Sequence, residues 1–491
     1  MTTTPSIRVR SLNEAPAAPE RGYVLYWMVA YRRLHWNFAL QRAVELANSL
    51  GRPLVILEIV SATYPYANDR FHRFVLDGVH HNARTAEPFA GVLHYAYVEP
   101  RAGAGEGLLE LFAESACAVV TDDWPGSEVP RLQAEAATRL RVQLEAVDSN
   151  GLLPLAAADK PHSTAHAFRR HLHKTLPGHM SMADFPMSAP LAALRAQQKP
   201  VLDTRVERWP QASPALLEGE AGWSDNLEID HRVAPVGRLR GGEAHAQRLL
   251  DIFMRERLAR YEVDRNEPAR EGGSGLSPYL HFGHISAHEI AQAVFSGENW
   301  TPANIAPKPT GSKAGWWGMS PAAEAFLDEL ITWREVGLNV ARMLPHYDTY
   351  EALPAWALAT LSKHAADPRP VVYNLKQLEA AETHDKLWNA AQRQLLREGR
   401  IHNYLRMLWG KKILEWSPSP QAAAATLLEL NDRYALDGSD PNSISGIFWC
   451  LGRFDRAWGP ERPIFGTIRY MSSDNTARKL DVKPYLARYG P

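Results

Sequence analysis

A strand, helix and strand pattern near the start of the chain limits its N-terminal part to one fold class. Residues 23–28 (YVLYWM) and 53–60 (PLVILEIV) are continuous apolar runs of strand length. Between them, residues 37–50 repeat apolar side chains at helical spacing until Gly51, a residue type that commonly ends helices. A helix that joins two buried strands forms a βαβ unit, in which the strands are parallel. The sequence therefore predicts a doubly wound, Rossmann-like α/β domain with a parallel sheet.

The rest of the chain divides into three further segments. Residues 1–21 are polar and lack the apolar core of a secretory signal, so we interpret them as a loose tail before an α/β domain at 22–155. Residues 156–240, rich in Pro, His and charged side chains, are interpreted as an interdomain linker. Residues 241–491 show helical periodicity and are predicted to form an all-helical domain. Additional strands of the α/β domain are predicted at 93–98, 118–121 and 142–147.

Charge and cysteine content restrict the function and the compartment. The chain has 54 Lys and Arg against 55 Asp and Glu, and its net charge of −1 supplies no general attraction to nucleic acid. DNA binding would therefore need a local basic patch. Cys117 and Cys450 are too few for a disulfide framework or a cysteine-ligated cluster. We predict no metal site and no membrane span, and expect a monomer in the cytoplasm.

A glycine cluster, Gly103, Gly105 and Gly107, precedes a predicted helix in the α/β domain. Glycines before a helix N-terminus can form a phosphate-binding loop. Their spacing does not match the GxGxxG pattern, and the cluster follows a Pro-Arg turn and not a strand end. We therefore interpret the cluster as a loop and predict no nicotinamide site.

Residues 273–286 (GSGLSPYLHFGHIS) combine small side chains and hydroxyls at the start of a helical run. Backbone N–H groups and Ser hydroxyls in this setting can bind a diphosphate. With residues 261–268 (YEVDRNEP) before it and the predicted helix 326–340 (FLDELITWREVGLNV) after it, the order of motifs is similar to that of the photolyase and cryptochrome superfamily. The resemblance implies a helical domain folded around a U-shaped flavin adenine dinucleotide (FAD).

Four stretches of the helical domain make the resemblance more specific, because they resemble class II cyclobutane pyrimidine dimer photolyases. The resemblance covers residues 240–491 and implies a lyase that repairs pyrimidine dimers in DNA by electron transfer from photoexcited, reduced FAD. The stretches are 383–416 (THDKLWNAAQRQLLREGRIHNYLRMLWGKKILEW), 430–449 (LNDRYALDGSDPNSISGIFW), 461–471 (ERPIFGTIRYM) and 478–485 (RKLDVKPY).

Three tryptophans lie in the first of these stretches. Trp409 and Trp416 are seven residues apart, about two helical turns, and share one face of a predicted helix, while Trp388 lies 21 residues before Trp409. Three tryptophans in a helical domain can simply line its core. In the family that the chain resembles, the tryptophans at these positions relay an electron to the flavin. Trp409 is then nearest the ring, and Trp388 lies between it and Trp416.

The turn-like segment after residue 430 carries two candidate flavin contacts, Asn431 and Asp437. The resemblance implies that the Asn431 amide faces the flavin N5 and that the Asp437 carboxylate accepts from the ring N3–H. Arg406 is predicted to pair with Asp437 and to stabilise an anionic reduced ring. Helix capping and turn formation are the alternative for Asn431 and Asp437. The full set implied to bind FAD is Tyr261, Arg265, Ser274, Gly275, Leu276, Ser277, Arg406, Asn431, Asp437 and Asp440.

Glu329 and Trp333 are four residues apart on a predicted helix and therefore share a face. The resemblance places the Glu329 carboxyl against a thymine carbonyl of a flipped-out dimer, with Trp333 and Trp449 as walls of the pocket and Met407 beneath. Glu329, Asn431 and the three relay tryptophans form the implied catalytic set, and a purely structural role is the alternative for the pocket residues. Arg456 and Arg469 are the favoured phosphate contacts, with Lys411, Lys412, Arg478 and Lys479 as further members of a basic patch.

Two segments depart from the family pattern. Residues 26–40 (YWMVAYRRLHWNFAL) lack the acidic and glutamine residues that usually follow the Met, which leaves open whether an antenna chromophore of the deazaflavin type binds. Residues 449–458 (WCLGRFDRAW) are one residue shorter than the family pattern, and Thr467 stands where a Lys is usual. These changes lie in the loop that is expected to face DNA, so they bear on the substrate preference.

The expected partner is DNA that contains pyrimidine dimers, and two other functions compete with repair. A cryptochrome-like photoreceptor would keep the flavin and the tryptophan chain but would signal through a partner. It is disfavoured because Glu329, Trp333 and Trp449 are all present and no long tail follows Tyr489. A helical nucleic-acid binder without flavin would require the whole flavin constellation to be accidental.

Overall fold

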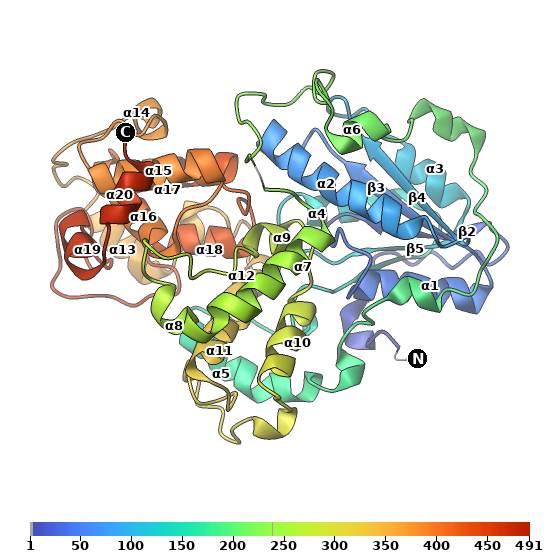
Figure 1. The fold of residues 1–491 in the computed structure, drawn as a ribbon, viewed down its shortest axis with the longest axis horizontal. Helices are drawn as coiled ribbons and strands as arrows, with labels where there is room; N and C mark the ends of the chain where they lie inside the picture. Colours follow the sequence, from blue (N-terminus) through green and yellow to red (C-terminus); the bar gives the residue numbers. More distant parts are fainter. Residues whose placement is uncertain (1–2, 238) are drawn as a thin grey trace. The chain divides into compact units, whose positions relative to one another are not determined.

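The structure is a computed structural model that describes residues 3–237 and 239–491. The chain divides into two compact units, each assembled from segments that are far apart in the sequence (Figure 1). Unit 1 runs to Asp159 and also takes Thr175–Asp251 and Leu276–Pro302. Unit 2 contains Lys160–Lys174, Ile252–Gly275 and Ala303–Pro491. Unit 1 holds the sheet, and unit 2 is helical.

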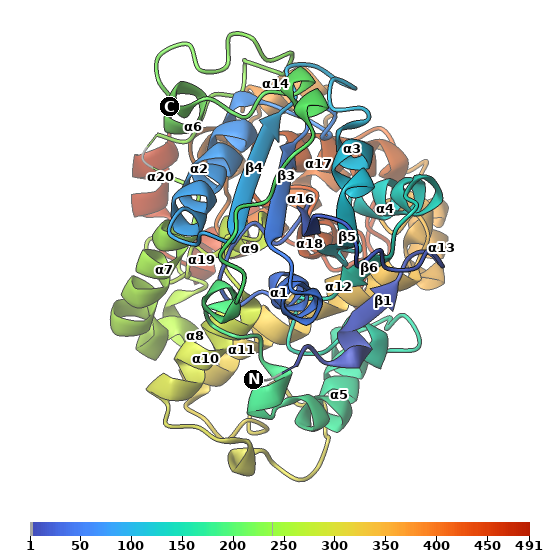
Figure 2. The same cartoon turned by 90° about the vertical axis from the view of Figure 1, so that its right-hand side faces the viewer.

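Unit 1 contains a six-stranded sheet in the order β1-β6-β5-β2-β3-β4 (Figure 2). The strands from β2 to β6 are parallel, with Val24 opposite Leu54 and Leu25 opposite Val119. The order reverses at β2, so the predicted doubly wound sheet is confirmed. All residues of β2 and β5 are buried, as expected for strands covered on both faces. The strands are β1 (Val9–Ser11), β2 (Tyr23–Met28), β3 (Leu54–Val60), β4 (Val92–Val98), β5 (Ala116–Asp122) and β6 (Leu144–Val147).

Helix α1 (Phe38–Leu50) begins and ends where its sequence directs. The Asn37 side-chain oxygen accepts from the N–H groups of Ala39 and Leu40, which satisfies donors that have no partner inside the helix. Gly51 ends the helix with a φ of 63°, a left-handed conformation that glycine adopts without strain. The other α-helices of unit 1 are α2 (Asp69–Ala86), α3 (Leu108–Glu114), α4 (Val129–Arg139), α6 (Pro214–Glu218), α7 (Glu243–Ile252), α9 (Ser277–His281) and α10 (Ala287–Gly297).

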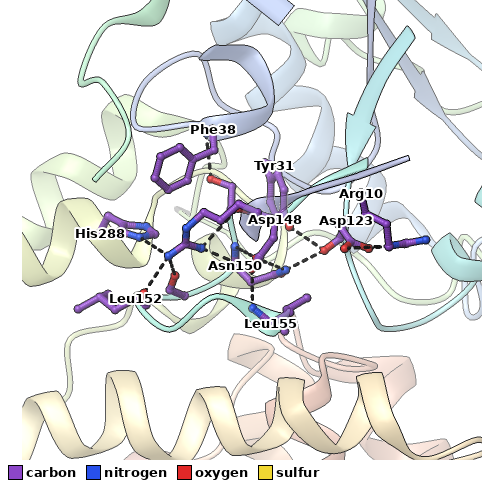
Figure 3. A network of polar contacts seen from close by, with 12 residues as sticks. Arg10, Tyr31, Phe38, Asp123, Asp148, Asn150, Leu152, Leu155 and His288 are labelled. Atoms are coloured by element: carbon purple, nitrogen blue, oxygen red, sulfur yellow. Dashed lines mark hydrogen bonds and ion pairs between the residues drawn. The ribbon is translucent and has the colours of Figure 1, made fainter. Parts of the chain in front are cut away.

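The N-terminal segment packs against the sheet, which corrects the prediction of a loose tail for residues 1–21 within the described part of that range. Val9–Ser11 form β1 and pair antiparallel with β6. Arg8 is buried, and its guanidinium lies 3.4 Å from the Asp148 carboxylate, donates to the Leu152 carbonyl at 2.8 Å and covers the Phe38 ring at 4.8 Å (Figure 3). A three-residue strand that contains Arg10 and follows Arg8 has no apolar pattern, so periodicity did not predict it.

Residues 156–240 are also more than a linker, which corrects the second boundary prediction. Most of the segment belongs to unit 1, where Trp209 is buried and donates from Nε1 to the Ala104 carbonyl at 2.9 Å. The Tyr95 hydroxyl in turn donates to the Trp209 carbonyl at 2.5 Å. One buried side chain can anchor a segment whose other residues remain polar. The prediction of a linker was based on that polarity. Its turns include η3 (Leu176–His179), η4 (Met182–Asp184), η5 (Pro190–Ala193) and η6 (Thr204–Arg208).

Unit 2 contains helices and, in its described residues, no strand longer than an isolated bridge. The predicted helix 326–340 is interrupted by a π-helical segment, η10 (Asp328–Trp333), that lies between α11 (Pro321–Leu327) and α12 (Arg334–Met343). Such segments are common at functional sites and change which side chains share a face. The remaining helices are α5 (Ala165–Thr175), η7 (Phe253–Arg257), α8 (Tyr261–Asp264), α13 (Ala355–Lys363), α14 (Leu375–Glu379), α15 (Lys386–Glu398), α16 (Asn403–Trp416), α17 (Pro420–Tyr434), α18 (Pro441–Trp449), α19 (Ser473–Lys479) and α20 (Lys483–Tyr489).

Close packing in unit 2 brings α12 and α18 together. A side chain at Gly337 would lie 2.8 Å from the Pro441 carbonyl oxygen, so only glycine allows this approach.

Among the residues that the structure describes, no helix has the length and apolar character that crossing a membrane requires.

The buried Arg8 makes a prediction about stability. Arg8→Met should lower the free energy of unfolding of unit 1 by about 3 kcal/mol, because the Asp148 carboxylate would remain buried without its cation. Urea denaturation followed by circular dichroism measures the change. Arg232→Met is the matched control, because Arg232 pairs with Asp230 while its side chain is 78% exposed. Equal effects of the two substitutions would contradict a structural role for the Arg8 contact.

Candidate functional site

Three buried indoles form a chain inside unit 2. The rings of Trp388, on α15, and Trp409, on α16, are nearly parallel at 4° with centroids 6.4 Å apart. Trp388 and Trp416 meet at 69° with centroids 5.5 Å apart, so Trp388 lies between the other two. The Trp388 Nε1–H donates to the Trp409 carbonyl at 3.0 Å, and the Trp409 Nε1–H donates to the Gln392 side chain at 2.9 Å. The order of the three indoles agrees with the order that the resemblance implies.

The outer end of this chain lies inside the protein. Trp416 is only 1% exposed, so a solute cannot touch it directly. Two other rings contact it, Tyr373 at 5.4 Å and His384 at 5.3 Å between centroids. Tyr373 is half-buried and its hydroxyl lies 2.8 Å from Nδ1 of the exposed His384. The sequence analysis missed Tyr373 and His384, because no helical spacing relates them to Trp416.

Arg406 and Asp437 form the predicted ion pair. The Arg406 Nη2 lies 3.0 Å from Oδ1 and 3.4 Å from Oδ2 of Asp437, and the two side chains are 14% and 13% exposed. The pair joins α16 to the turn between α17 and α18. A charge-assisted bond of this kind holds a guanidinium at a fixed position.

Asn431 is buried at the end of α17, and its amide has two partners. Its Nδ2 donates to Asp432 Oδ1 at 2.7 Å and to the Ser443 hydroxyl at 3.0 Å. These bonds orient the amide, so Asp432 and Ser443 are supporting residues that the sequence analysis did not identify. Asp440 accepts from the Asn442 N–H at 2.8 Å and caps α18, so capping belongs to Asp440 and not to Asn431.

Glu329 pairs with Arg265, a contact that the sequence did not indicate. The Glu329 Oε1 and Arg265 Nη1 are 2.6 Å apart, and each side chain is about one third exposed. Burial raises the pKa of the Glu329 carboxyl above its ordinary value, while the nearby Arg265 lowers it. Arg265 also covers the Tyr261 ring at 5.5 Å. One predicted cofactor residue, Arg265, thus contacts the predicted substrate carboxyl, and a second, Tyr261, contacts Arg265.

Trp333, Met407 and Trp449, the predicted pocket walls, are each half-buried. Trp449 ends α18 and lies next to Cys450, whose thiol is 3.9 Å from the Met407 carbonyl oxygen. This contact brings the Trp449 end of α18 to the Met407 turn of α16. Trp333 ends η10, four residues after Glu329.

The basic patch is smaller than predicted. Lys411 is fully buried, and Lys412 is largely buried with Nζ 2.8 Å from Glu415, so neither is available to DNA phosphates. Arg456 and Arg469 are exposed, as are Arg478 and Lys479 at the end of α19. The error arose because helical spacing does not show which lysines of α16 face the interior.

The predicted diphosphate segment falls in both units. Tyr261, Arg265, Ser274 and Gly275 belong to unit 2, with Gly275 at a φ of 74°. Leu276 and Ser277 belong to unit 1, where Ser277 begins α9.

Unit 1 has a pocket of about 460 Å³ at the carboxyl ends of its parallel strands. This is the edge at which doubly wound sheets bind ligands. Its lining includes Trp27, near the end of β2, with Arg32 and Trp124 just beyond β2 and β5. Gly103, Gly105 and Gly107 form part of its rim. The glycine cluster is a loop, as interpreted, and Gly105 donates from its N–H to Glu99 at 2.8 Å. Its position beside a pocket could not be read from its spacing.

The protein has a doubly wound α/β unit and a helical unit that contains a buried chain of indoles. These two units define its fold class. The structure is similar to that of a bacterial class III photolyase from Agrobacterium tumefaciens, with a TM-score of 0.65 at 18% identity over 96% of this chain and 86% of that one. This likeness establishes a photolyase fold. No family model matches the sequence.

Sequence comparison extends the result from the fold to the family. The chain is 36% identical over 482 residues to a deoxyribodipyrimidine photo-lyase of Methanothermobacter thermautotrophicus, which covers 98% of this chain and 97% of the relative. It is 32% identical to the enzymes of the same name from Arabidopsis thaliana (98% and 92% covered) and Potorous tridactylus (95% and 81% covered). The chain belongs to the deoxyribodipyrimidine photo-lyase family.

Proposed function

We propose that this protein is a class II photolyase that binds FAD and uses light to repair cyclobutane pyrimidine dimers in DNA. The observation that carries the proposal is the chain of buried indoles, Trp409, Trp388 and Trp416, inside a unit of this family. When bound, reduced FAD supplies light absorption and one electron, which splits the dimer and then returns, so the reaction is that of a lyase. The residues of unit 2 provide the binding, the orientation and the path for electrons.

The polar residues of unit 2 fit the ring of a flavin. A guanidinium fixed by a carboxylate, as in Arg406 and Asp437, places positive charge where an anionic ring is stabilised, and the Asp437 carboxylate can accept a ring N–H. The Asn431 amide, oriented by Asp432 and Ser443, offers a further polar contact from a dry environment. Tyr261, Arg265, Ser274, Gly275, Leu276, Ser277 and Asp440 complete the proposed FAD-binding set.

The half-buried residues of unit 2 support a lesion pocket. Trp333, Trp449 and Met407 offer apolar surface for stacking an extruded dimer, which leaves the duplex more easily than intact bases do. Burial raises the pKa of the Glu329 carboxyl, and Arg265 holds that carboxyl in place, where it can contact a thymine of the extruded dimer. Arg456 and Arg469 would contact the DNA backbone.

A cryptochrome-like photoreceptor needs the flavin and the relay but no lesion pocket. Glu329 and Trp333 are both partly exposed, which favours repair over this alternative. Two side chains with a purely structural role would be buried away from solvent. The buried free cysteines, Cys117 and Cys450, are consistent with a reducing compartment, and we place the protein in the cytoplasm as a monomer.

Illuminating the reduced protein with DNA that contains thymine dimers tests the function directly. Recovery of intact thymines in the light and not in the dark is expected. Glu329→Ala should lower the yield about tenfold and leave the flavin spectrum nearly unchanged, because one hydrogen bond that strengthens as charge develops is lost. Chromatography of the digested DNA measures the recovery. Undiminished repair would remove Glu329 from the active site.

The relay predicts the effect of removing its inner indole. Trp409→Phe should leave FAD bound but slow its photoreduction by at least about a hundredfold, because the ring that continues to Trp388 is gone. Absorbance of the flavin under illumination with a thiol reductant follows the rate. Trp300→Phe, which removes an indole of unit 1, is the matched control. A rate unchanged in Trp409→Phe would defeat the relay assignment.

We further propose that the pocket of unit 1 binds an antenna chromophore of the deazaflavin type. Its volume of about 460 Å³ and the flanking rings of Trp27 and Trp124 suit a planar aromatic ligand. Ile59→Trp, which adds bulk to the pocket wall, should abolish binding of an added deazaflavin and the extra repair that its absorption supports. Repair excited in the FAD band should persist. Binding retained by Ile59→Trp would place the chromophore elsewhere.

A further inference from the structure

Lys411 is a fully buried lysine whose ammonium has no carboxylate partner within the described parts of the chain. Its Nζ donates to the Cys450 carbonyl at 2.6 Å and lies 4.9 Å from the centre of the Trp449 ring. A buried charge without a counter-ion is unfavourable unless other groups stabilise it. The face of an indole is such a group. Lys411 therefore sits where its charge acts on Trp449.

A second cation reaches the same indole from the surface. The Arg469 guanidinium lies 5.7 Å from the Trp449 ring and 4.9 Å from the Trp458 ring. Arg456 covers Trp458 at 4.6 Å. Cations and indoles thus alternate from the interior to the surface, in the order Lys411, Trp449, Arg469, Trp458 and Arg456. No ion pair involves Arg469 in the part of the chain that the structure covers.

The relay indoles have a different electrostatic environment. Over the described residues, no cation lies above the rings of Trp388 or Trp409. Lys412 lies 5.4 Å from the Trp416 ring, but its charge is offset by Glu415 at 2.8 Å and Asp385 at 3.9 Å. Among these four indoles, only Trp449 is flanked by two cations that form no ion pair with a carboxylate in the described residues.

We propose that Lys411, together with Arg469, keeps Trp449 hard to oxidise, so that this indole serves as a wall of the lesion pocket while electrons are drawn from the relay. Loss of one electron would make the Trp449 indole a radical cation, and nearby positive charges oppose its formation. Lys411 is thus a positioning residue that acts through Trp449. The inference takes the pocket and the relay from the proposed function.

One-electron oxidation of the full-length protein in the dark tests the proposal without light or a lesion. Azide radicals take one electron from an indole and become azide ions, and the indole then loses its N–H proton to water. Dissolved oxygen adds to the resulting indolyl radical and converts it to a stable oxidised product. Peptide mass spectrometry gives the ratio of oxidised Trp449 to oxidised Trp333, a half-buried indole with no cation described above its ring. Lys411→Met, which keeps an unbranched side chain but removes the charge, should raise this ratio at least about threefold at pH near 7. Lys411→Arg should keep it low.

The pH dependence separates an electrostatic effect from a change in packing. Burial lowers the pKa of Lys411 to about 8, so the ammonium loses its charge as the pH rises through that value. The groups that face it are the Cys450 thiol, whose pKa is raised to about 11, Asp455 and Arg469. The wild-type ratio should therefore rise between about pH 7 and pH 9, while Lys411→Met stays high and Lys411→Arg stays low.

Lys412→Met is the matched control, because Lys412 is adjacent in sequence but lies over Trp416. It should leave the Trp449 to Trp333 ratio at the wild-type value. The proposal is wrong if folded Lys411→Met gives the wild-type ratio at both pH values. If Lys411→Met does not fold, the pH dependence of the ratio in the wild-type protein and in Lys411→Arg still tests the proposal. The proposal is wrong if these two curves coincide. If the protein does not repair DNA, the proposed function is wrong. The measured oxidation ratio does not depend on that result and still tests the effect of Lys411 on Trp449.

Discussion

The contact between α15 and α16 organises the helical unit. The Trp388 indole stacks on Trp409 and donates to its backbone carbonyl, so a ring contact and a hydrogen bond fix the same pair of helices. The Trp409 N–H in turn bonds Gln392 on α15. Because buried polar groups need partners, these bonds specify the rotation of each helix and not only their proximity. The same rotation places Arg406 opposite Asp437 and turns Lys411 inward.

Charge placement distinguishes the indoles of unit 2. Trp388, Trp409 and Trp416 lie among apolar or neutralised neighbours, whereas Trp449 lies between Lys411 and Arg469. Identical side chains therefore differ in how readily they lose an electron, because the local potential differs. A near-neutral protein can in this way carry strong local fields. The net charge, which offered no hint of nucleic-acid binding, averages over them.

The sequence predicted what depends on periodicity and failed where single contacts decide. The five parallel strands and α1 follow from apolar spacing and from Asn37 and Gly51, and the Arg406 to Asp437 pair followed from the family resemblance. Burial of Lys411, the Glu329 to Arg265 pair and the role of Trp209 as an anchor depend on tertiary packing that no local pattern encodes. The π-helical segment η10 was missed because its extra residue per turn leaves the apolar pattern nearly helical.

The first strand has a consequence for how the chain is made. β1 pairs with β6, and Arg8 bonds Asp148, a partner 140 residues later. While the nascent chain leaves the ribosome, Val9–Ser11 and the Arg8 side chain remain solvated until residue 148 has been synthesised. Closing so large a loop is slow compared with forming a βαβ unit. The first strand in the sequence is therefore the last strand to join its sheet.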